Sequence, residues 1–236
     1  MKTLAIFGAG KGLGLSLAKR FGKEGFRVAL VARNAEKLQQ MVEELTTMGI
    51  ESAYFTADIY SKEQIEKAVS AIKEKFGKID VLEVSPVPGN FPPTSVLHLT
   101  IENARDAFEG YAASSINIVN AVLPDLLERK DGALLFTTGF SALHPMAMMG
   151  NIGVGIAGLR NYVANLHTEL QDKGIYVGHR SLALFISEPG TGKVSDPDVI
   201  ADMWYKAYSE KEVWEQEYPK GITAEALLAF HAENTQ

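Results

Sequence analysis

A short apolar run meets a cluster of glycines in the segment Leu4-Ala5-Ile6-Phe7-Gly8-Ala9-Gly10-Lys11-Gly12-Leu13-Gly14-Leu15. Apolar residues then recur at helical spacing at Leu17, Ala18 and Phe21. A short uninterrupted apolar run is typical of a buried strand, and apolar residues spaced by about three or four positions are typical of one helix face. The segment therefore predicts a strand, a tight turn and the first turn of a helix.

The spacing of these glycines bears on phosphate binding. The pattern Gly-x-Gly-x-x-Gly does not fit, because Leu13 stands where its third glycine would be, but a longer spacing through Gly8, Gly12 and Gly14 does fit. Glycines let the backbone approach a pyrophosphate closely, and a helix N-terminus offers it N–H groups and a positive dipole end. A plain glycine-rich turn is the alternative. The predicted cofactor contacts in this loop are Gly8, Gly10, Lys11, Gly12, Leu13 and Gly14.

The composition limits the class of protein. The chain has 236 residues, of which 46% are hydrophobic, and this is ample for a well-buried core. A formal net charge of -6 argues against a nucleic-acid partner, and the absence of cysteine excludes disulfides, thiolate nucleophiles and cysteine-bound metals. We find no metal-ligand spacing, no apolar run near the ~18 residues that span a bilayer and no signal-peptide pattern. The default expectation is a cytoplasmic protein without membrane contact.

Strand and helix patterns alternate along the rest of the chain. Strands are expected at 27–32, 52–57, 79–85 and 132–139, and from 175 weakly to 186. Helices are expected at 15–24, 35–48, 61–76, 101–128 (kinked or broken at Pro124), 152–172 and 198–209, with a short one at 224–232. This alternation predicts an α/β fold, a doubly wound parallel sheet of the Rossmann type with three layers. We expect residues 1–236 to form a single NAD(P)-binding domain, with 187–236 as a small extension on the substrate side.

The ends of the second and third strands bear on cofactor choice. A dinucleotide fold that prefers NAD usually has an acidic residue at the end of the second strand, but this chain has Ala32 followed by Arg33. Arg33, helped by Lys11, therefore favours the 2′-phosphate of NADP(H), although a solvated strand-end charge is the alternative. Asp58, followed by Ile59, ends the third strand and suits a hydrogen bond from the adenine amine, or a turn or helix cap.

Further motifs occur in a fixed order. They are Ile79-Asp80-Val81-Leu82, Leu123-Pro124, and Leu166-His167-Thr168-Glu169-Leu170 followed by Gly174-Ile175-Tyr176-Val177. With the glycine loop, they make the chain resemble the short-chain dehydrogenase/reductase family over essentially its whole length. The resemblance implies an NADP(H)-dependent oxidoreductase that forms a homodimer or homotetramer through the helices near 101–128 and 152–172. It also places Ser187 where the family often binds the nicotinamide carboxamide with a threonine.

The catalytic positions depart from that family. Its members use an asparagine, a serine and a Tyr-x-x-x-Lys pair, and counting along the motifs places Tyr111, Gly139, Ile152 and Ile156 at these positions. A change of register does not restore the pair, because Tyr162 is followed four residues later by Leu166. Isoleucine can neither donate a proton nor hydrogen-bond a ribose, so the family's usual mechanism is unavailable.

Other polar side chains are candidates for the missing role. Tyr111, Thr138 and His144 are weak catalytic candidates, each with a structural alternative: a packed tyrosine, a strand-end hydroxyl bonded to backbone and a loop histidine. Asn151 borders the site. The loop at 144–151 contains three methionines, which predicts an apolar cavity because methionine fills irregular gaps.

Two functions from different classes follow. One is an NADP(H)-dependent oxidoreductase that acts on an apolar carbonyl or alcohol by a non-standard mechanism, since positioning alone lowers a barrier substantially. The other is a catalytically inactive member that senses the cofactor or serves as a structural partner subunit, without any small-molecule substrate. A third, weaker hypothesis is that cofactor binding is lost as well.

Overall fold

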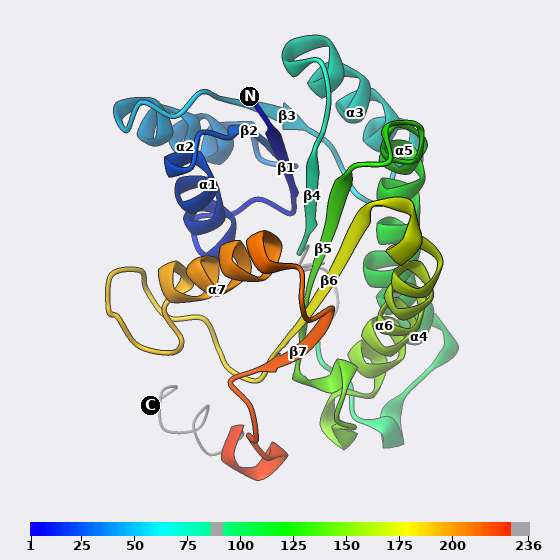
Figure 1. The fold of residues 1–236 in the computed structure, drawn as a ribbon. Helices are drawn as coiled ribbons and strands as arrows, with labels where there is room; N and C mark the ends of the chain where they lie inside the picture. Colours follow the sequence, from blue (N-terminus) through cyan, green and yellow to red (C-terminus); the bar gives the residue numbers. More distant parts are fainter. Residues whose placement is uncertain (86–91, 228–236) are drawn as a thin grey trace.

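The computed structural model describes residues 1–85 and 92–227 (Figure 1). Among them, seven parallel strands form one sheet in the order β3-β2-β1-β4-β5-β6-β7. The strands are β1 (Thr3–Phe7), β2 (Arg27–Ala32), β3 (Ser52–Thr56), β4 (Val81–Val84), β5 (Gly132–Gly139), β6 (Ile175–Leu182) and β7 (Glu215–Tyr218). The helices are α1 (Leu13–Lys23), α2 (Ala35–Thr47), α3 (Lys62–Phe76), α4 (Ile101–Phe108), α5 (Ser114–Arg129), α6 (Gly150–Leu170) and α7 (Pro197–Glu210).

Helices cover both faces of the sheet, so the predicted doubly wound, three-layer fold is confirmed (Figure 1). The reason lies in the alternation of side chains along each strand. On β1, Leu4 and Ile6 pack with α1, α2 and α7, whereas Ala5 and Phe7 pack with α3, α5 and α6. Both faces of these central strands are buried, and their sequences are therefore uninterrupted apolar runs.

The topology decides where a ligand site can lie. The strand order reverses between β1 and β4, because the chain winds outward from β1 to β3 and then crosses back to β4. In such sheets, ligands bind in the crevice beyond the carboxyl ends of the strands at this reversal. The glycine loop follows β1 and therefore lies at that edge.

The edge strand β7 was not predicted from the sequence. It pairs in parallel with β6, from His179 opposite Glu215 to Leu182 opposite Tyr218. Its sequence, Glu-Gln-Glu-Tyr, does not alternate apolar and polar residues. All four residues of this edge strand are only half-buried, so none of its faces has to be apolar. The sixth strand also ends at Leu182 and does not continue to 186.

The segment expected as one helix over 101–128 is irregular at a different place. Pro124 lies inside α5, which continues through it, and the irregularity is a π-helical turn at Glu109–Ala113. The hydroxyls of Ser114 and Ser115 donate to the carbonyls of Gly110 and Tyr111, at 2.6 Å each. These bonds satisfy carbonyls that a wide turn leaves without their usual partner, and such turns occur often at functional sites.

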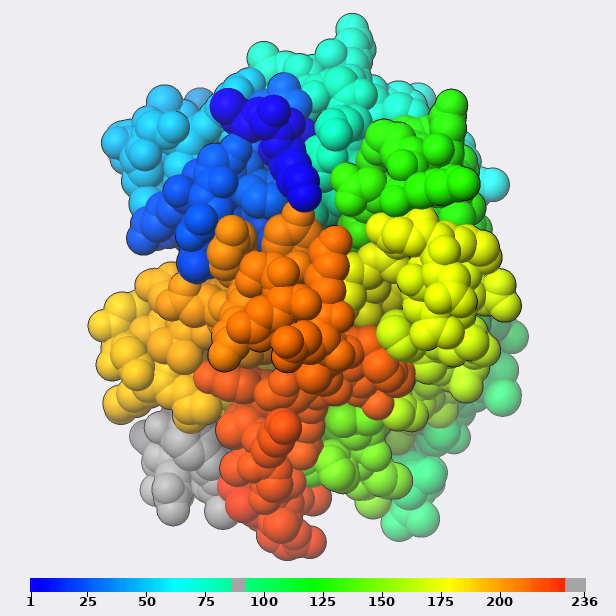
Figure 2. All heavy atoms as spheres, in the orientation of Figure 1, coloured from blue at the N-terminus to red at the C-terminus, as the bar shows by residue number. Residues whose placement is uncertain are grey.

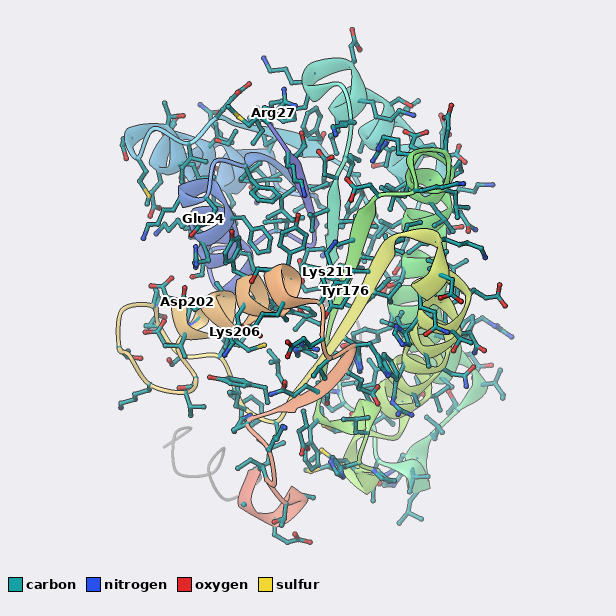
Figure 3. All side chains as sticks on the ribbon, in the orientation of Figure 1. Glu24, Arg27, Tyr176, Asp202, Lys206 and Lys211 are labelled. Carbon is teal, nitrogen blue, oxygen red and sulfur yellow. The ribbon has the colours of Figure 1, made fainter. Side chains whose placement is uncertain are left out.

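The C-terminal part joins the main layers. Helix α7 packs against α1, where Arg20 forms ion pairs at 2.6 Å with Glu24, just after α1, and with Asp202 on α7. Figure 3 labels the two acidic residues. In Figure 2, α7 is the orange surface between blue α1 and red β7. The segment 187–236 was expected to form a small extension, and its described part, 187–227, supplies α7 and the edge strand β7. Residues 86–91 and the end of the helix expected at 224–232 lie outside the described residues.

Within the described part of the chain, no helix is both long enough and apolar enough to cross a bilayer.

Candidate functional site

A cavity of about 590 Å³ lies beyond the carboxyl ends of the central strands. Gly8, Gly10, Leu13 and Gly14 line one end of it, where β1 passes into α1. The other end is formed by apolar side chains, namely Phe140, Met146, Met148, Met149, Phe185 and Ile186. The cavity therefore joins the glycine loop to the methionine-rich wall that the sequence predicts.

The glycine loop is built for close backbone approach. Gly8 has a φ of +91°, which favours glycine, and a Cβ on Gly14 would lie 3.0 Å from the Cα of Ala9, so α1 packs directly on the turn. A Cβ on Gly10 or Gly12 would meet nothing within 4 Å, so there is open space beside the loop. Gly12 is the N-cap of α1 and makes no side-chain cap hydrogen bond, so the N-terminus of the helix begins beside this space.

The predicted selectivity residues lie at neighbouring strand ends. Arg33 follows β2 and is exposed, and both Arg33 and Asp58 act electrostatically on the hydroxyl of Tyr60. The Asp58 carboxylate accepts a hydrogen bond from the Tyr60 N–H at 3.1 Å, which is the turn role that the sequence left open. Ile59 is half-buried next to it, and Lys11 is exposed in the glycine loop.

Ser187 lies just beyond the cavity wall. Its hydroxyl donates to the carbonyl of Glu188 at 3.2 Å, while the preceding residue, Ile186, lines the cavity. A contact between Ser187 and a cofactor thus stays a prediction.

The positions counted for the family's catalytic residues converge on the cavity. Tyr111, Gly139, Ile152 and Ile156 all line it, although they come from a π turn, a strand end and α6. Ile156 is only 1% exposed, and burial raises the pKa of Tyr111 to about 12. Three of these positions therefore present no titratable group to the cavity.

Two polar residues near the cavity, the weak candidate His144 and the bordering Asn151, have structural partners. The Nε2 atom of His144 lies 2.7 Å from a Glu217 carboxylate oxygen, and its ring stacks on Phe140 with centroids 4.6 Å apart. Asn151 is fully buried, and its amide accepts from Thr94 N–H and donates to the Pro92 carbonyl. Both side chains fix the loops that border the cavity.

A buried carboxyl group that no sequence motif indicated is hydrogen-bonded to two cavity-lining hydroxyls. Glu83 is on β4, is 0% exposed and accepts hydrogen bonds from Ser85 and Thr137 at 2.9 Å each. Thr137 in turn accepts from the indole N–H of Trp204 at 3.0 Å. Burial raises the pKa of Glu83 to about 7, although the two hydroxyl bonds oppose the shift. The group titrates in the physiological range.

A second polar chain lies on the other face of the sheet. The Thr138 hydroxyl is 2.8 Å from His179 Nε2, and His179 Nδ1 is 3.0 Å from a Glu215 oxygen. Arg160 on α6 donates to both oxygens of Glu215, at 2.8 and 2.7 Å. Burial raises the pKa of Glu215, but the bonds from His179 and Arg160 outweigh it and lower the value to about 2. Glu215 is ionised at neutral pH.

The family model described as short chain dehydrogenase matches residues 2–185. The chain belongs to the short-chain dehydrogenase family. This oxidoreductase family accounts for the glycine spacing and for the strand order.

Two curated relatives and one solved structure show what the chain is similar to. A short chain dehydrogenase of Pseudocercospora fijiensis is 25% identical over 180 residues, which cover 74% of this chain but only 56% of that protein. A 3-oxoacyl-acyl-carrier-protein reductase of Staphylococcus epidermidis is 25% identical over 204 residues, covering 83% of this chain and 79% of that protein. An actinorhodin polyketide ketoreductase variant, solved with NADPH, matches with a TM-score of 0.82 at 22% identity, over 92% of this chain and 95% of that one. At that identity the likeness shows the fold.

Proposed function

We propose that this short-chain dehydrogenase binds NADP(H) and interconverts an apolar carbonyl compound and its alcohol in the cavity. One observation carries the proposal: a single cavity connects the glycine loop to a wall of methionine and phenylalanine side chains. The loop suits a dinucleotide and the wall suits an apolar substrate, so both reactants would meet in one water-poor space.

The residues at the loop fit a dinucleotide phosphate. The backbone of Gly10 and Gly12 faces open space, and the start of α1 supplies N–H groups and a positive dipole end. Arg33 and Lys11 would hold the 2′-phosphate, with Asp58 and Ile59 beside the adenine and Ser187 beside the carboxamide. When bound, the cofactor supplies or accepts a hydride. The NADPH in the ketoreductase that shares this fold supports the choice of cofactor.

The apolar lining favours hydrophobic substrates. Met146, Met148 and Met149 adapt their shape to a ligand, and Ile152 and Ile156 replace polar groups with hydrocarbon. A small polar carbonyl compound would lose its hydration without regaining enough hydrogen bonds here. The substrate class is therefore an aromatic or aliphatic ketone or aldehyde, or the matching alcohol.

A second candidate function is a cofactor-binding protein without catalysis, either a sensor or a partner subunit. The two isoleucines at the tyrosine and lysine positions favour it, because neither supports proton transfer. In either case we propose a homodimer or homotetramer. Ile101, Phe108 and Val154 are exposed on α4 and α6, where the resemblance places the interface.

Cofactor choice is tested by the variant Arg33→Ala. Because Arg33 is exposed, loss of its charge-assisted bond to a 2′-phosphate is expected to weaken NADPH binding about tenfold, while NADH binding stays unchanged. Titration followed by cofactor fluorescence and by the melting temperature measures both affinities. Lys23→Ala, at the far end of α1, is the control for loss of a cation. An unchanged ratio of the two affinities would reject the Arg33 assignment, and binding of neither cofactor would reject the proposed function.

A further inference from the structure

We propose that Thr138 is the proton donor and acceptor at the cavity, with His179 and Glu215 as the positioning residues that supply and hold the proton. The inference rests on the proposed carbonyl reduction. It assigns the role of the family's tyrosine to a group on a different element, because Ile152 stands at the tyrosine position.

The position of Thr138 meets the first requirement of a proton donor, which is access to the substrate. Thr138 lies at the carboxyl end of β5, lines the cavity and directly precedes Gly139. On its other side, its hydroxyl is 2.8 Å from His179 Nε2, within hydrogen-bond reach. The threonine thus lies between the cavity and the imidazole.

The partners of His179 determine where its protons lie. Glu215 is ionised, so it only accepts hydrogen bonds, and the 3.0 Å contact requires a proton on His179 Nδ1. Arg160 holds the same carboxylate through two bonds, which fixes the orientation of the ring. His179 is 0% exposed, so Nε2 faces Thr138 and not bulk water.

This arrangement works in both directions. When the imidazole is charged, Nε2 donates to the Thr138 oxygen, and the hydroxyl proton of Thr138 is free to point into the cavity. When the imidazole is neutral, Nε2 accepts from Thr138, whose oxygen can then take a proton from a substrate alcohol. Reduction and oxidation therefore use the same chain of groups in opposite directions.

Reduction of a carbonyl group transfers a hydride to its carbon and a proton to its oxygen. Bound NADPH would supply a hydride to the substrate carbonyl carbon, and the π electron pair of the C=O bond would move to the oxygen. That oxygen takes the hydroxyl proton of Thr138, while Thr138 takes the Nε2 proton of His179. The imidazole becomes neutral and, after the alcohol leaves, regains one proton from cavity water through the Thr138 hydroxyl, because His179 itself is buried. Each carbonyl group reduced consumes one hydride and one proton.

Glu83 is a weaker candidate because of its geometry. It lies on the opposite face of the sheet, and both of its oxygens accept hydrogen bonds from the cavity-lining hydroxyls of Ser85 and Thr137. Those hydroxyl protons therefore point toward Glu83 and away from the cavity. Thr137 also accepts from Trp204, which holds it in place.

The first test reads a hydrogen bond without any turnover. Acetophenone labelled with carbon-13 at the carbonyl is bound in the presence of NADP⁺, and the infrared C=O band is recorded. A hydroxyl donor lowers the frequency of this band, so we expect a lowered band in the wild type and in Thr138→Ser, and a higher one in Thr138→Val. Ser181→Ala, which removes a buried hydroxyl from β6 outside the cavity lining, is the control. A band that is unchanged in Thr138→Val would overturn the proposal.

The second test separates proton supply from substrate contact. In acetophenone reduction, we expect Thr138→Val to lower kcat about tenfold or more with little change in KM, and Thr138→Ser to recover most of the loss. His179→Gln should keep the lowered infrared band but lower kcat about as much as Thr138→Val does. It also tests the proposal if Thr138→Val does not fold. Equal kcat in His179→Gln and wild type would reject the role of the imidazole.

Two further outcomes separate this proposal from others. An acetyl adduct on Thr138 after incubation with p-nitrophenyl acetate would assign the group as an acyl-transfer nucleophile and overturn the proton-donor role. If NADPH or acetophenone does not bind to the wild type, the proposed function itself fails. Binding and turnover that persist in Thr138→Val would instead reject only the role of Thr138.

Discussion

The triple variant Gly139→Ser, Ile152→Tyr and Ile156→Lys is expected to reduce apolar ketones about 100-fold faster than the natural chain, because a phenol beside a lysine ammonium is a much stronger general acid than the aliphatic hydroxyl of Thr138. All three positions line the same cavity. A serine fits at Gly139, whose backbone is extended at a φ of -92° and whose Cβ would meet nothing within 4 Å. The lysine replaces a buried isoleucine and needs the open side of the cavity for its charge.

NADPH oxidation with acetophenone measures the gain, and cofactor titration of the same protein shows whether NADPH still binds. The matched control is Gly139→Ser, Ile152→Phe and Ile156→Lys. Phenylalanine keeps the aromatic ring of the tyrosine and lacks its hydroxyl. No gain in a folded triple variant that binds NADPH would mean that the cavity does not hold a carbonyl group beside the restored tyrosine. The proposed substrate class would then be wrong.

Glu83→Gln is expected to stabilise the fold at pH 8 by about 3 kcal/mol and to have little effect near pH 4. The pKa of the Glu83 carboxyl is raised from 4.5 to about 7 in the folded protein by burial. The favourable contribution of Glu83 to the free energy of unfolding is therefore fully present below pH 4.5. It declines as the pH rises and is lost above about pH 7, where an ionised carboxylate stays buried. Glutamine has the same shape and no charge, so it removes this loss.

Denaturant unfolding of both proteins between pH 5 and pH 8 measures the effect. The difference in unfolding free energy should widen by about 2 kcal/mol across this range, because most of the titration of Glu83 lies within it. Glu74→Gln, on the exposed side of α3, is the control for loss of one carboxylate. A difference that does not vary with pH would show that Glu83 does not titrate in this window.

The sequence alone was sufficient for the features that depend on local patterns. The apolar run before Gly8 and the spacing of Gly8, Gly12 and Gly14 predicted β1, the turn and α1, because buried strands and tight turns need these residues wherever they occur. The motif spacing also singled out Tyr111, Gly139, Ile152 and Ile156, and the structure brings all four to one cavity.

Only the tertiary structure decided what lies beside those positions. Thr138, His179 and Glu215 are separated by 41 and 36 residues along the chain, and their contact depends on the pairing of β5 with β6 and of β6 with the unpredicted β7. Likewise, Glu83 has a raised pKa because helices close over both faces of β4, which no local pattern records. Apolar burial and turn geometry are properties of short segments, whereas hydrogen-bond partners of buried polar groups are set by which strands become neighbours.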